Sequence, residues 1–377
     1  MSGENVDPRQ HGASEYDQEA ALLITSLRGA PIDVPGNIDW PRLRDLAVEN
    51  GVLAIVHESL SEMRADLPGF FASAAGECRR SAEEFAAILE DLLHSFAERA
   101  IDVLPLKGPA LAAVLYGDAT SRSYNDLDLL VRPGDYRRAE ALLLDLGFVG
   151  QETDDYHRRF VRDGIPVELH LEVASPRYFR FDSDGIWRRS RIEHFRGKAT
   201  HAMCADDLVL YLCLHGLKHG FSRLIWILDA ARALRAPGLI HDELVRGARR
   251  EGLEPWLLIG CEVVRAMLPG QVPEALDAVI AEEPETARRA RQVAASLFTE
   301  GLEVVNDHRI RSFYLQTERS ARWRWRCRMG FLVPTIEDYR WAEHHGINRR
   351  LMHVLRPFRL LKKHGPGPTW RATFPRV

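Results

Sequence analysis

The order of apolar and polar residues divides the chain into regions with different predicted structure. From residue 19 to about residue 100, apolar residues recur at three- and four-residue spacing, as at Phe85, Ile88, Leu89 and Leu92, which is typical of amphipathic helices. From residue 101 to 175, short apolar runs of strand length alternate with short helical patterns. Long helical patterns then return, most clearly over residues 207–234.

The middle region is predicted to be an α+β core with a small mixed β-sheet. We expect strands at residues 101–106, 126–131, 157–162 and 165–173, and helices at residues 109–116 and 135–146. Gly117 and Gly147 end the two helices, and Asp135 is a candidate N-cap. The dipeptide Asp163-Gly164 joins the last two strands as a tight hairpin. Helical regions are expected on both sides of this core.

These patterns give the following division of the chain. Residues 1–15 are predicted to be a disordered N-terminus, 16–100 an N-terminal helical region, 101–175 the α/β core, 176–335 a C-terminal helical domain and 336–377 a basic C-terminal segment.

Two carboxylates lie in the second predicted strand, within the apolar run Asp126-Leu127-Asp128-Leu129-Leu130-Val131. Alternate side chains of a strand share a face, so Asp126 and Asp128 point the same way. At a separation of about 6–7 Å they repel by roughly 2–3 kcal/mol at an effective dielectric constant near 20. A bound cation relieves that repulsion, and aspartate oxygens are ligands that Mg²⁺ prefers.

The turn after the first strand, Lys107-Gly108-Pro109, is a candidate phosphate site. Gly108 allows a close approach of the backbone at a point where a strand leads into a helix N-terminus, and free N–H groups and the helix dipole favour an anion there. The structural alternative is an ordinary turn.

The helical pattern over residues 207–234 carries polar side chains that its packing does not require. His215 and His219 are four residues apart and share a helix face, with Lys218, Arg223 and Asp229 nearby. We interpret this segment as a substrate or nucleotide wall facing the carboxylates. Zinc binding by the two histidines is not favoured, because the middle residues of the known zinc-protease pattern are absent. Trp226 is assigned to the core rather than to base stacking.

Composition narrows the class of protein. The formal net charge is −4, but residues 301–377 hold 16 Lys/Arg and 6 Asp/Glu, so the C-terminal end is strongly basic. The five cysteines form no C-x-x-C pair, which favours a reducing compartment and argues against a disulfide framework. The N-terminal residues have no signal-peptide pattern, and no apolar run is long enough to span a membrane. We therefore predict a cytoplasmic location.

The series of short motifs resembles the bacterial family of poorly characterised nucleotidyltransferases, within the superfamily of the DNA polymerase beta fold. The matching motifs are Leu106-Lys107-Gly108, Leu115-Tyr116-Gly117-Asp118, Arg122, residues 126–131, Leu146-Gly147-Phe148, Val167-Glu168-Leu169-His170, residues 215–219 and residues 223–229. One departure is Pro109, which stands where the superfamily usually has a serine and has no N–H to donate.

The resemblance implies transfer of a nucleotidyl group by a two-metal mechanism, with two Mg²⁺ ions, or Mn²⁺ in their place. Asp126, Asp128 and Glu168 would be both the catalytic residues and the metal ligands, with Glu172 the substitute for Glu168 if the register shifts. Lys107, Arg122 and Lys218 are the candidates to neutralise the leaving group. The full set assigned to substrate and nucleotide binding is Lys107, Gly108, Arg122, Ser123, His170, His215, Lys218, His219 and Arg223.

The predicted function is therefore Mg²⁺-dependent transfer of a nucleoside monophosphate from a nucleoside triphosphate to a hydroxyl-bearing acceptor, with release of pyrophosphate. The acceptor is a small molecule, a peptide natural product or a protein. One alternative is an inactive nucleotide- or partner-binding module with the same fold. Another alternative is association with RNA or a membrane surface through the basic C-terminal segment. Nucleic-acid binding is less favoured, because the arginines of residues 322–328 can instead form ion pairs with acidic residues of the rest of the protein.

Overall fold

The structure is a computed structural model, and it describes residues 17–29, 34–63, 67–153, 156–176, 179 and 181–281, isolated positions between 284 and 348, and residues 351–364. The predicted disordered segment 1–15 and parts of the basic segment 336–377 lie outside the described residues.

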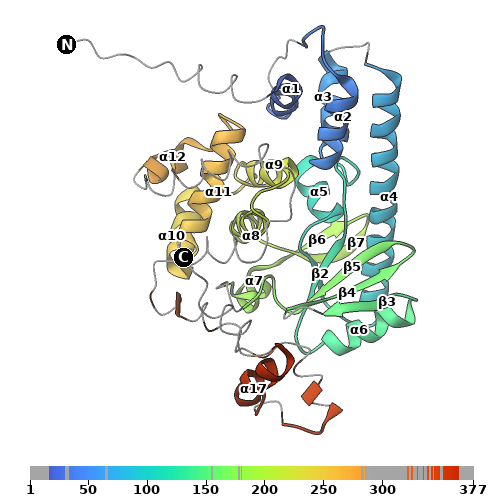
Figure 1. Cartoon of the computed structure of the whole chain (residues 1–377), viewed down its shortest axis with the longest axis vertical. Coiled ribbons are helices and arrows are strands. Elements are labelled where there is room, and N and C mark those ends of the chain that lie inside the picture. The colour runs from blue at the N-terminus through green and yellow to red at the C-terminus, as the bar shows by residue number, and fades with distance from the viewer. Residues whose placement is uncertain are drawn as a thin grey trace, which may run out of the picture.

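A five-stranded sheet forms the centre of the described structure (Figure 1). Its strands are β1 (Val103–Pro105), β2 (Leu127–Val131), β3 (Val149–Thr153), β4 (His157–Arg162) and β5 (Ile165–His170). The order across the sheet is β1-β2-β5-β4-β3. β2 and β5 are parallel, and the other neighbouring pairs are antiparallel, so the sheet is mixed.

The two faces of the sheet have different neighbours because apolar and polar residues alternate along β2 and β5. One face carries Leu127, Leu129, Val167 and Leu169, which pack into a core with α4 (Gly69–Glu98) and α6 (Tyr136–Asp145). In Figure 1, α4 is the long helix along one side of the molecule. The other face carries the polar residues of the two strands and lies beneath the helices of the second core.

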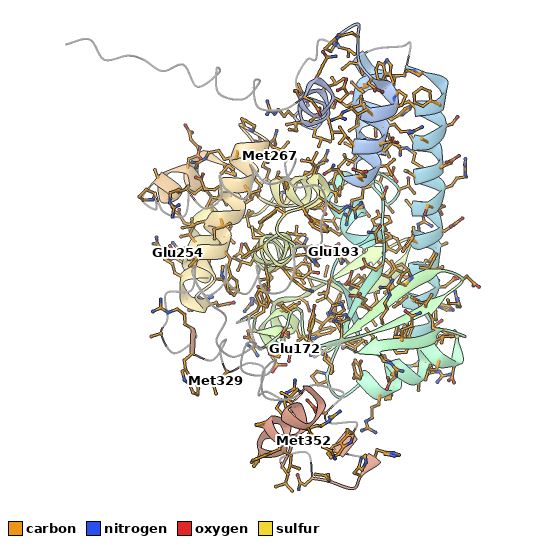
Figure 2. All side chains as sticks on the ribbon, viewed as in Figure 1. Glu172, Glu193, Glu254, Met267, Met329 and Met352 are labelled. Carbon is orange, nitrogen blue, oxygen red and sulfur yellow. The ribbon has the colours of Figure 1, made fainter. Side chains whose placement is uncertain are left out.

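The second core joins the N-terminal helices to those that follow the sheet. The N-terminal helices are α1 (Gln18–Ser26), α2 (Trp40–Glu49) and α3 (Leu53–Met63), and the later ones are α8 (Ala205–Lys218), α9 (Leu224–Ala233), α10 (His241–Glu251), α11 (Glu254–Met267) and α12 (Glu274–Ala281). Figure 2 shows side chains filling the space between these helices and the sheet. The remaining described elements are α5 (Pro109–Tyr116), α7 (Ser183–Arg189), the hairpin β6 (Arg191–Phe195) and β7 (Lys198–Ala202), and α17 (Met352–His364).

The predicted α+β class with a small mixed sheet and helices on both sides is confirmed. Several local expectations need correction. β5 ends at His170 and not at Val173. His170 pairs with His157, which is the first residue of β4, so the β4–β5 ladder ends at that pair. Asp135 takes the cap position of α6 but makes no capping hydrogen bond, and its carboxylate instead pairs with Arg138 at 2.6 Å. Strand β3 and the β6–β7 hairpin were not expected.

Candidate active site

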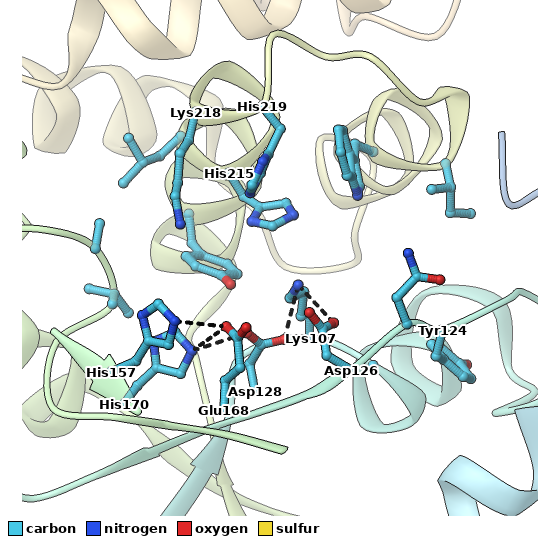
Figure 3. Close-up of a pocket in the computed structure, with 18 of the residues that line it drawn as sticks. Lys107, Tyr124, Asp126, Asp128, His157, Glu168, His170, His215, Lys218 and His219 are labelled. Carbon is cyan, nitrogen blue, oxygen red and sulfur yellow. Dashed lines mark hydrogen bonds and ion pairs between the residues drawn. The ribbon is translucent and has the colours of Figure 1, made fainter. Parts of the chain in front are cut away.

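A cavity of about 290 Å³ lies between the polar face of the sheet and the helices α8 and α9. Every residue that we assigned to the site from the sequence lines it. These residues are Lys107, Gly108, Arg122, Ser123, Asp126, Asp128, Glu168, His170, His215, Lys218, His219 and Arg223. The tertiary structure thus brings together segments that are more than one hundred residues apart in the chain (Figure 3).

The floor of the cavity carries three carboxylates. Asp128 on β2 and Glu168 on β5 are direct partners in the parallel ladder, so their side chains share a face. Asp126 immediately precedes β2, and one oxygen from each of Asp126, Asp128 and Glu168 lies within 4.8 Å of the others. The side chains of Asp126 and Glu168 are 26% and 19% exposed, so the group is open to a ligand. Oxygen atoms at this spacing can hold a divalent cation.

Lys107 reaches this floor from the turn after β1. Its Nζ lies 3.1 Å from Oδ1 of Asp126 and 3.0 Å from Oδ2 of Asp128. Burial opposes the charge on Lys107, but the two aspartates raise its pKa above the ordinary value. Burial likewise opposes ionisation of Asp128, yet Lys107 and His170 keep the pKa of Asp128 below the ordinary value. The two groups are therefore a charged, buried ion pair.

Two imidazoles lie beside the floor. Nε2 of His170 is 3.0 Å from Oδ1 of Asp128 and 3.5 Å from Oε2 of Glu168. Nε2 of His157 is also 3.5 Å from Oε2 of Glu168. Burial raises the pKa of Glu168, but the hydrogen bond from His170 and the charge of His157 outweigh it and lower that pKa to about 2. Glu168 is thus ionised at neutral pH, and it is a weak base.

The substitute that we considered, Glu172, is not part of this group. It follows the end of β5, and its carboxylate accepts a hydrogen bond from Ser183 at the start of α7. Glu172 is labelled in Figure 2. Glu172 lies four residues after Glu168, and an even spacing preserves the face only while the strand continues; β5 stops before Glu172.

Gly108 precedes α5 and has φ +87°, a conformation that glycine adopts at little cost. A Cβ at this position would lie 3.5 Å from Leu127 and 3.9 Å from the carbonyl oxygen of Asp126. The turn therefore places the N-terminus of α5 beside the carboxylates, and its left-handed backbone makes glycine the preferred residue.

Arg122 is buried at one end of the cavity. Its Nη1 lies 3.1 Å from Oδ2 of Asp229 on α9, and Oδ1 of Asp229 accepts a hydrogen bond from the Tyr116 hydroxyl at 2.7 Å. The guanidinium also lies over the ring of Tyr124, 5.1 Å from its centroid. Nε of Arg122 is buried without a hydrogen-bond partner among the described residues.

Arg223 is the second cationic residue at the end of the cavity where Arg122 lies. Its Nε donates to the carbonyl oxygen of Glu49 at 2.9 Å, and its Nη1 donates to the Asn125 amide oxygen at 3.0 Å once that amide is oriented to satisfy both of its groups. No described carboxylate forms an ion pair with Arg223. Burial and the nearby Arg122 lower the pKa of Arg223. A half-buried cation whose hydrogen-bond acceptors are neutral favours an anionic ligand.

The roof of the cavity is an aromatic wall from α8 and α9. The rings of His215 and His219 lie 4.8 Å apart, and Trp226 lies 5.4 Å from His215 and 5.0 Å from His219. Burial, with Lys107 and Lys218 nearby, lowers the pKa of His215 well below the ordinary value and that of His219 to about 3. Both imidazoles are therefore neutral, and Nε2 of His215 has no hydrogen-bond partner among the described residues.

Some residues of the cavity were not found by sequence reasoning. Tyr156, His157, Tyr211 and Asn125 all line it. The Tyr156 hydroxyl contacts Nζ of Lys218, which links the residue before β4 to the end of α8. A signal for His157 was present: the two-residue turn Asp163-Gly164 pairs Arg162 with Ile165, and continuing that register pairs His157 with His170.

The chain belongs to the family of uncharacterised nucleotidyltransferases, whose family model matches residues 36–269. The predicted family and enzyme class are thereby confirmed: the protein is a nucleotidyltransferase. No curated protein matches the chain.

Three solved structures have some likeness to this chain at low sequence identity. A crystal structure of ANT(2")-Ia with adenylyl-2"-tobramycin is 14% identical, with a TM-score of 0.36 over 44% of this chain and 97% of that one. The solution structure of the antibiotic-resistance factor ANT(2'')-Ia is also 14% identical, with a TM-score of 0.35 over 44% of this chain and 91% of that one. An antigenic nucleotidyltransferase-like protein from Paracoccidioides brasiliensis is 14% identical, with a TM-score of 0.33 over 56% of this chain and 94% of that one.

Among the described residues, no helix is both long and apolar enough to cross a membrane. The arginine-rich stretch 322–328 lies largely outside the described residues. Where α17 is described, Arg356 and Arg359 pair with Asp338.

Proposed function

We propose that the protein is a Mg²⁺-dependent nucleotidyltransferase that moves a nucleoside monophosphate from a nucleoside triphosphate to an acceptor hydroxyl and releases pyrophosphate. The observation that carries this proposal is the convergence of Asp126, Asp128 and Glu168 within 4.8 Å on the floor of an open cavity. Basic side chains surround those carboxylates on the side where a triphosphate would lie.

The three carboxylates fit a divalent cation. All three offer oxygen ligands, as Mg²⁺ requires, and Oδ2 of Asp128 is buried without a hydrogen bond of good geometry, although Lys107 lies 3.0 Å away. Asp126, Asp128 and Glu168 would hold the ions. Bound there, Mg²⁺ would offset the negative charge that gathers on the phosphate oxygens during transfer.

The phosphates are proposed to bind between the turn at Gly108 and the two arginines. The N-terminus of α5 offers backbone N–H groups and a favourable dipole, although Pro109 contributes no N–H. Nε of Arg122 has no hydrogen-bond partner among the described residues, and Arg223 has no described carboxylate partner. Lys107 would move from the two aspartates to the leaving pyrophosphate as cations replace it.

Glu168 is proposed to orient the attacking hydroxyl. Its pKa of about 2 keeps it ionised, so it can accept a hydrogen bond from that hydroxyl at neutral pH. The same low pKa makes it a poor proton acceptor by itself. Activation of the hydroxyl therefore depends on positive charge near it as well as on the carboxylate.

The aromatic wall is proposed to contact the acceptor or the base. His215, His219 and Trp226 present a neutral surface opposite the carboxylates, and Nε2 of His215 can exchange a hydrogen bond with a ligand. A volume of about 290 Å³ is at the lower end for a pocket that encloses a whole drug-sized ligand. The cavity thus suits the reacting groups, with the rest of a larger acceptor outside it.

The test is incubation of the protein with each labelled triphosphate, Mg²⁺ and a panel of hydroxylated small molecules, peptides and proteins. Pyrophosphate release and a nucleotide-sized mass increase of the acceptor are the readouts. Asp126→Asn combined with Asp128→Asn should reduce turnover by at least about 1000-fold, because it removes the charge that binds the ions.

The matched control is Asp163→Asn, which removes a carboxylate that is 87% exposed in the β4–β5 turn. Its turnover should equal that of the wild type. Equal turnover in the double variant would refute the mechanism. Triphosphate binding without Mg²⁺ and without pyrophosphate release would instead support an inactive binding module.

A further inference from the structure

The imidazoles of His157 and His170 both point at one oxygen of Glu168. Each Nε2 lies 3.5 Å from Oε2. The rings stack with centroids 4.9 Å apart and an interplanar angle of 18°, and Figure 3 shows them side by side facing the carboxylates. Both histidines come from neighbouring antiparallel strands, where they are direct partners.

The hydrogen bond on the far side of the His170 ring fixes its orientation. Nδ1 of His170 lies 3.3 Å from the carbonyl oxygen of Glu172, which can only accept, so Nδ1 carries a proton. Nε2 faces Glu168 and Asp128, to which it donates without a metal; a cation bound there would replace the Nε2 proton and take the lone pair of that nitrogen. Histidines that ligate metals commonly hold their other ring nitrogen in this way.

We propose that His157, Glu168 and His170 form a second cation site, which binds a divalent transition-metal ion of the Zn²⁺ type. The proposal rests on the proposed function in one respect: Glu168 then belongs both to this nitrogen-containing site and to the oxygen site with Asp126 and Asp128. One ligand atom from each of His157, Glu168 and His170 lies within 4.8 Å of the others.

The spacing of the ligand atoms agrees with this ion. In a tetrahedral site with bonds of about 2.1 Å, neighbouring ligand atoms lie about 3.4 Å apart. The two distances from imidazole nitrogen to Oε2 of Glu168, both 3.5 Å, match that value. Two imidazoles and one carboxylate are also a ligand set of catalytic zinc sites, which keep a fourth position open.

The oxygen site and the nitrogen-containing site differ in the atoms that they offer to a cation. Asp126 and Asp128 offer only oxygen, which suits Mg²⁺, whereas imidazole nitrogen suits Zn²⁺ and related ions far better than Mg²⁺. Two cations bound side by side would thus be of different kinds, joined by Glu168. A simple orienting role, in which the histidines only donate hydrogen bonds to Glu168, is the other explanation of the same distances.

A binding experiment separates these explanations. Co²⁺ reports on the Zn²⁺ site through its visible absorption, which depends on the number and type of ligands. The full-length protein, freed of metal by a chelator, is titrated with Co²⁺ in a large excess of Mg²⁺. We expect one tightly bound Co²⁺ that Mg²⁺ does not displace, and Zn²⁺ should displace it.

The informative variant is His157→Gln, because glutamine still donates a hydrogen bond to Glu168 but offers no imidazole nitrogen. We expect its Co²⁺ affinity to fall by more than about 10-fold, with a changed absorption spectrum. The control His94→Gln removes an exposed histidine of α4 and should bind Co²⁺ as the wild type does. Asp126→Asn should also retain the site.

An independent measurement uses the wild-type protein alone. X-ray absorption of the Zn²⁺-loaded protein should show two imidazole ligands. The proposal is overturned if His157→Gln binds Co²⁺ as the wild type does, if excess Mg²⁺ removes all Co²⁺, or if the spectrum shows no imidazole. Such a result leaves the proposed function intact when the Asp126 and Asp128 variants still lose turnover, so the two failures can be told apart.

Discussion

Nζ of Lys107 lies 3.0 Å from Oδ2 of Asp128, within the group of oxygen atoms that we propose as a cation site. The same ammonium lies 3.1 Å from Oδ1 of Asp126, so it bridges the two aspartates. An ammonium and a divalent cation at one place repel each other. Metal binding must therefore displace Lys107 from this position, which frees it to contact phosphate.

This relationship predicts opposite effects of Lys107→Met on binding and on catalysis. Without nucleotide, the variant should bind Mg²⁺ about 10-fold more tightly, because no ammonium competes for Asp126 and Asp128. Its kcat/KM should nevertheless fall by about 100-fold or more, because the leaving pyrophosphate loses a cation. Calorimetry with Mg²⁺ and a pyrophosphate-release assay measure the two effects. A parallel fall of both quantities would contradict the displacement.

Gly108→Ala should separate backbone strain from function. Gly117 is left-handed, with φ +75° and ψ −2°, where alanine costs about 1–2 kcal/mol of folding free energy, whereas Gly108 has φ +87° and ψ −150°, a region essentially restricted to glycine, where the cost reaches about 3 kcal/mol. Urea unfolding should show a loss of stability in both variants, with the larger loss in Gly108→Ala. Turnover should fall clearly only for Gly108→Ala, because Gly108 lines the cavity and Gly117 does not. Equal turnover in the two variants would argue against a phosphate-binding turn.

The buried pair Arg122–Asp229 should dominate stability near the site. Asp229→Asn leaves the Arg122 guanidinium buried without its counter-charge, which typically costs about 3–5 kcal/mol. Tyr116→Phe removes only the 2.7 Å hydrogen bond to the Asp229 carboxylate and should cost about 1.5–3 kcal/mol. Thermal and urea unfolding give both values. A smaller loss for Asp229→Asn than for Tyr116→Phe would show that Arg122 finds another partner.

Acid pH should destabilise the protein through the aromatic wall. Burial and the charges of Lys218 and Lys107 outweigh those of Asp126 and Asp128 and lower the pKa of folded His219 to about 3, whereas the unfolded value is about 6.5. Between these values the unfolded chain binds the extra proton. The free energy of unfolding should thus fall as pH decreases below about 6.5, by up to about 1.4 kcal/mol per pH unit for each such histidine.

The variant His219→Gln cannot titrate at this position, so its unfolding free energy should depend less steeply on pH than that of the wild type. Urea titrations at pH 7 and pH 5 give the comparison, without added metal or nucleotide. His94→Gln, on the exposed surface of α4, should keep the wild-type dependence. An unchanged slope in His219→Gln would mean that His219 does not remain neutral in the folded protein.

The sequence determined the local features of this protein. Apolar spacing predicted the helices of the N-terminal region and of the α8–α9 pair, and Asp163-Gly164 predicted the β4–β5 hairpin, because these signals arise from residues close together in the chain. The alternation in β2 also placed Leu127 and Leu129 in the core and Asp128 on the opposite face. The site residues named from the sequence were recognisable because each lies in a short motif.

Tertiary structure alone decided which groups meet. That Asp128 pairs with Glu168 follows from the parallel register of β2 and β5, and that register depends on how the intervening α6 and hairpin pack. The ion pair of Arg122 with Asp229 and the contact of Lys218 with Tyr156 join segments separated by long stretches of chain. The periodicity of side chains along a strand or helix specifies which face is buried, but it does not specify which other element packs against that face. That element is determined by the packing of the whole core.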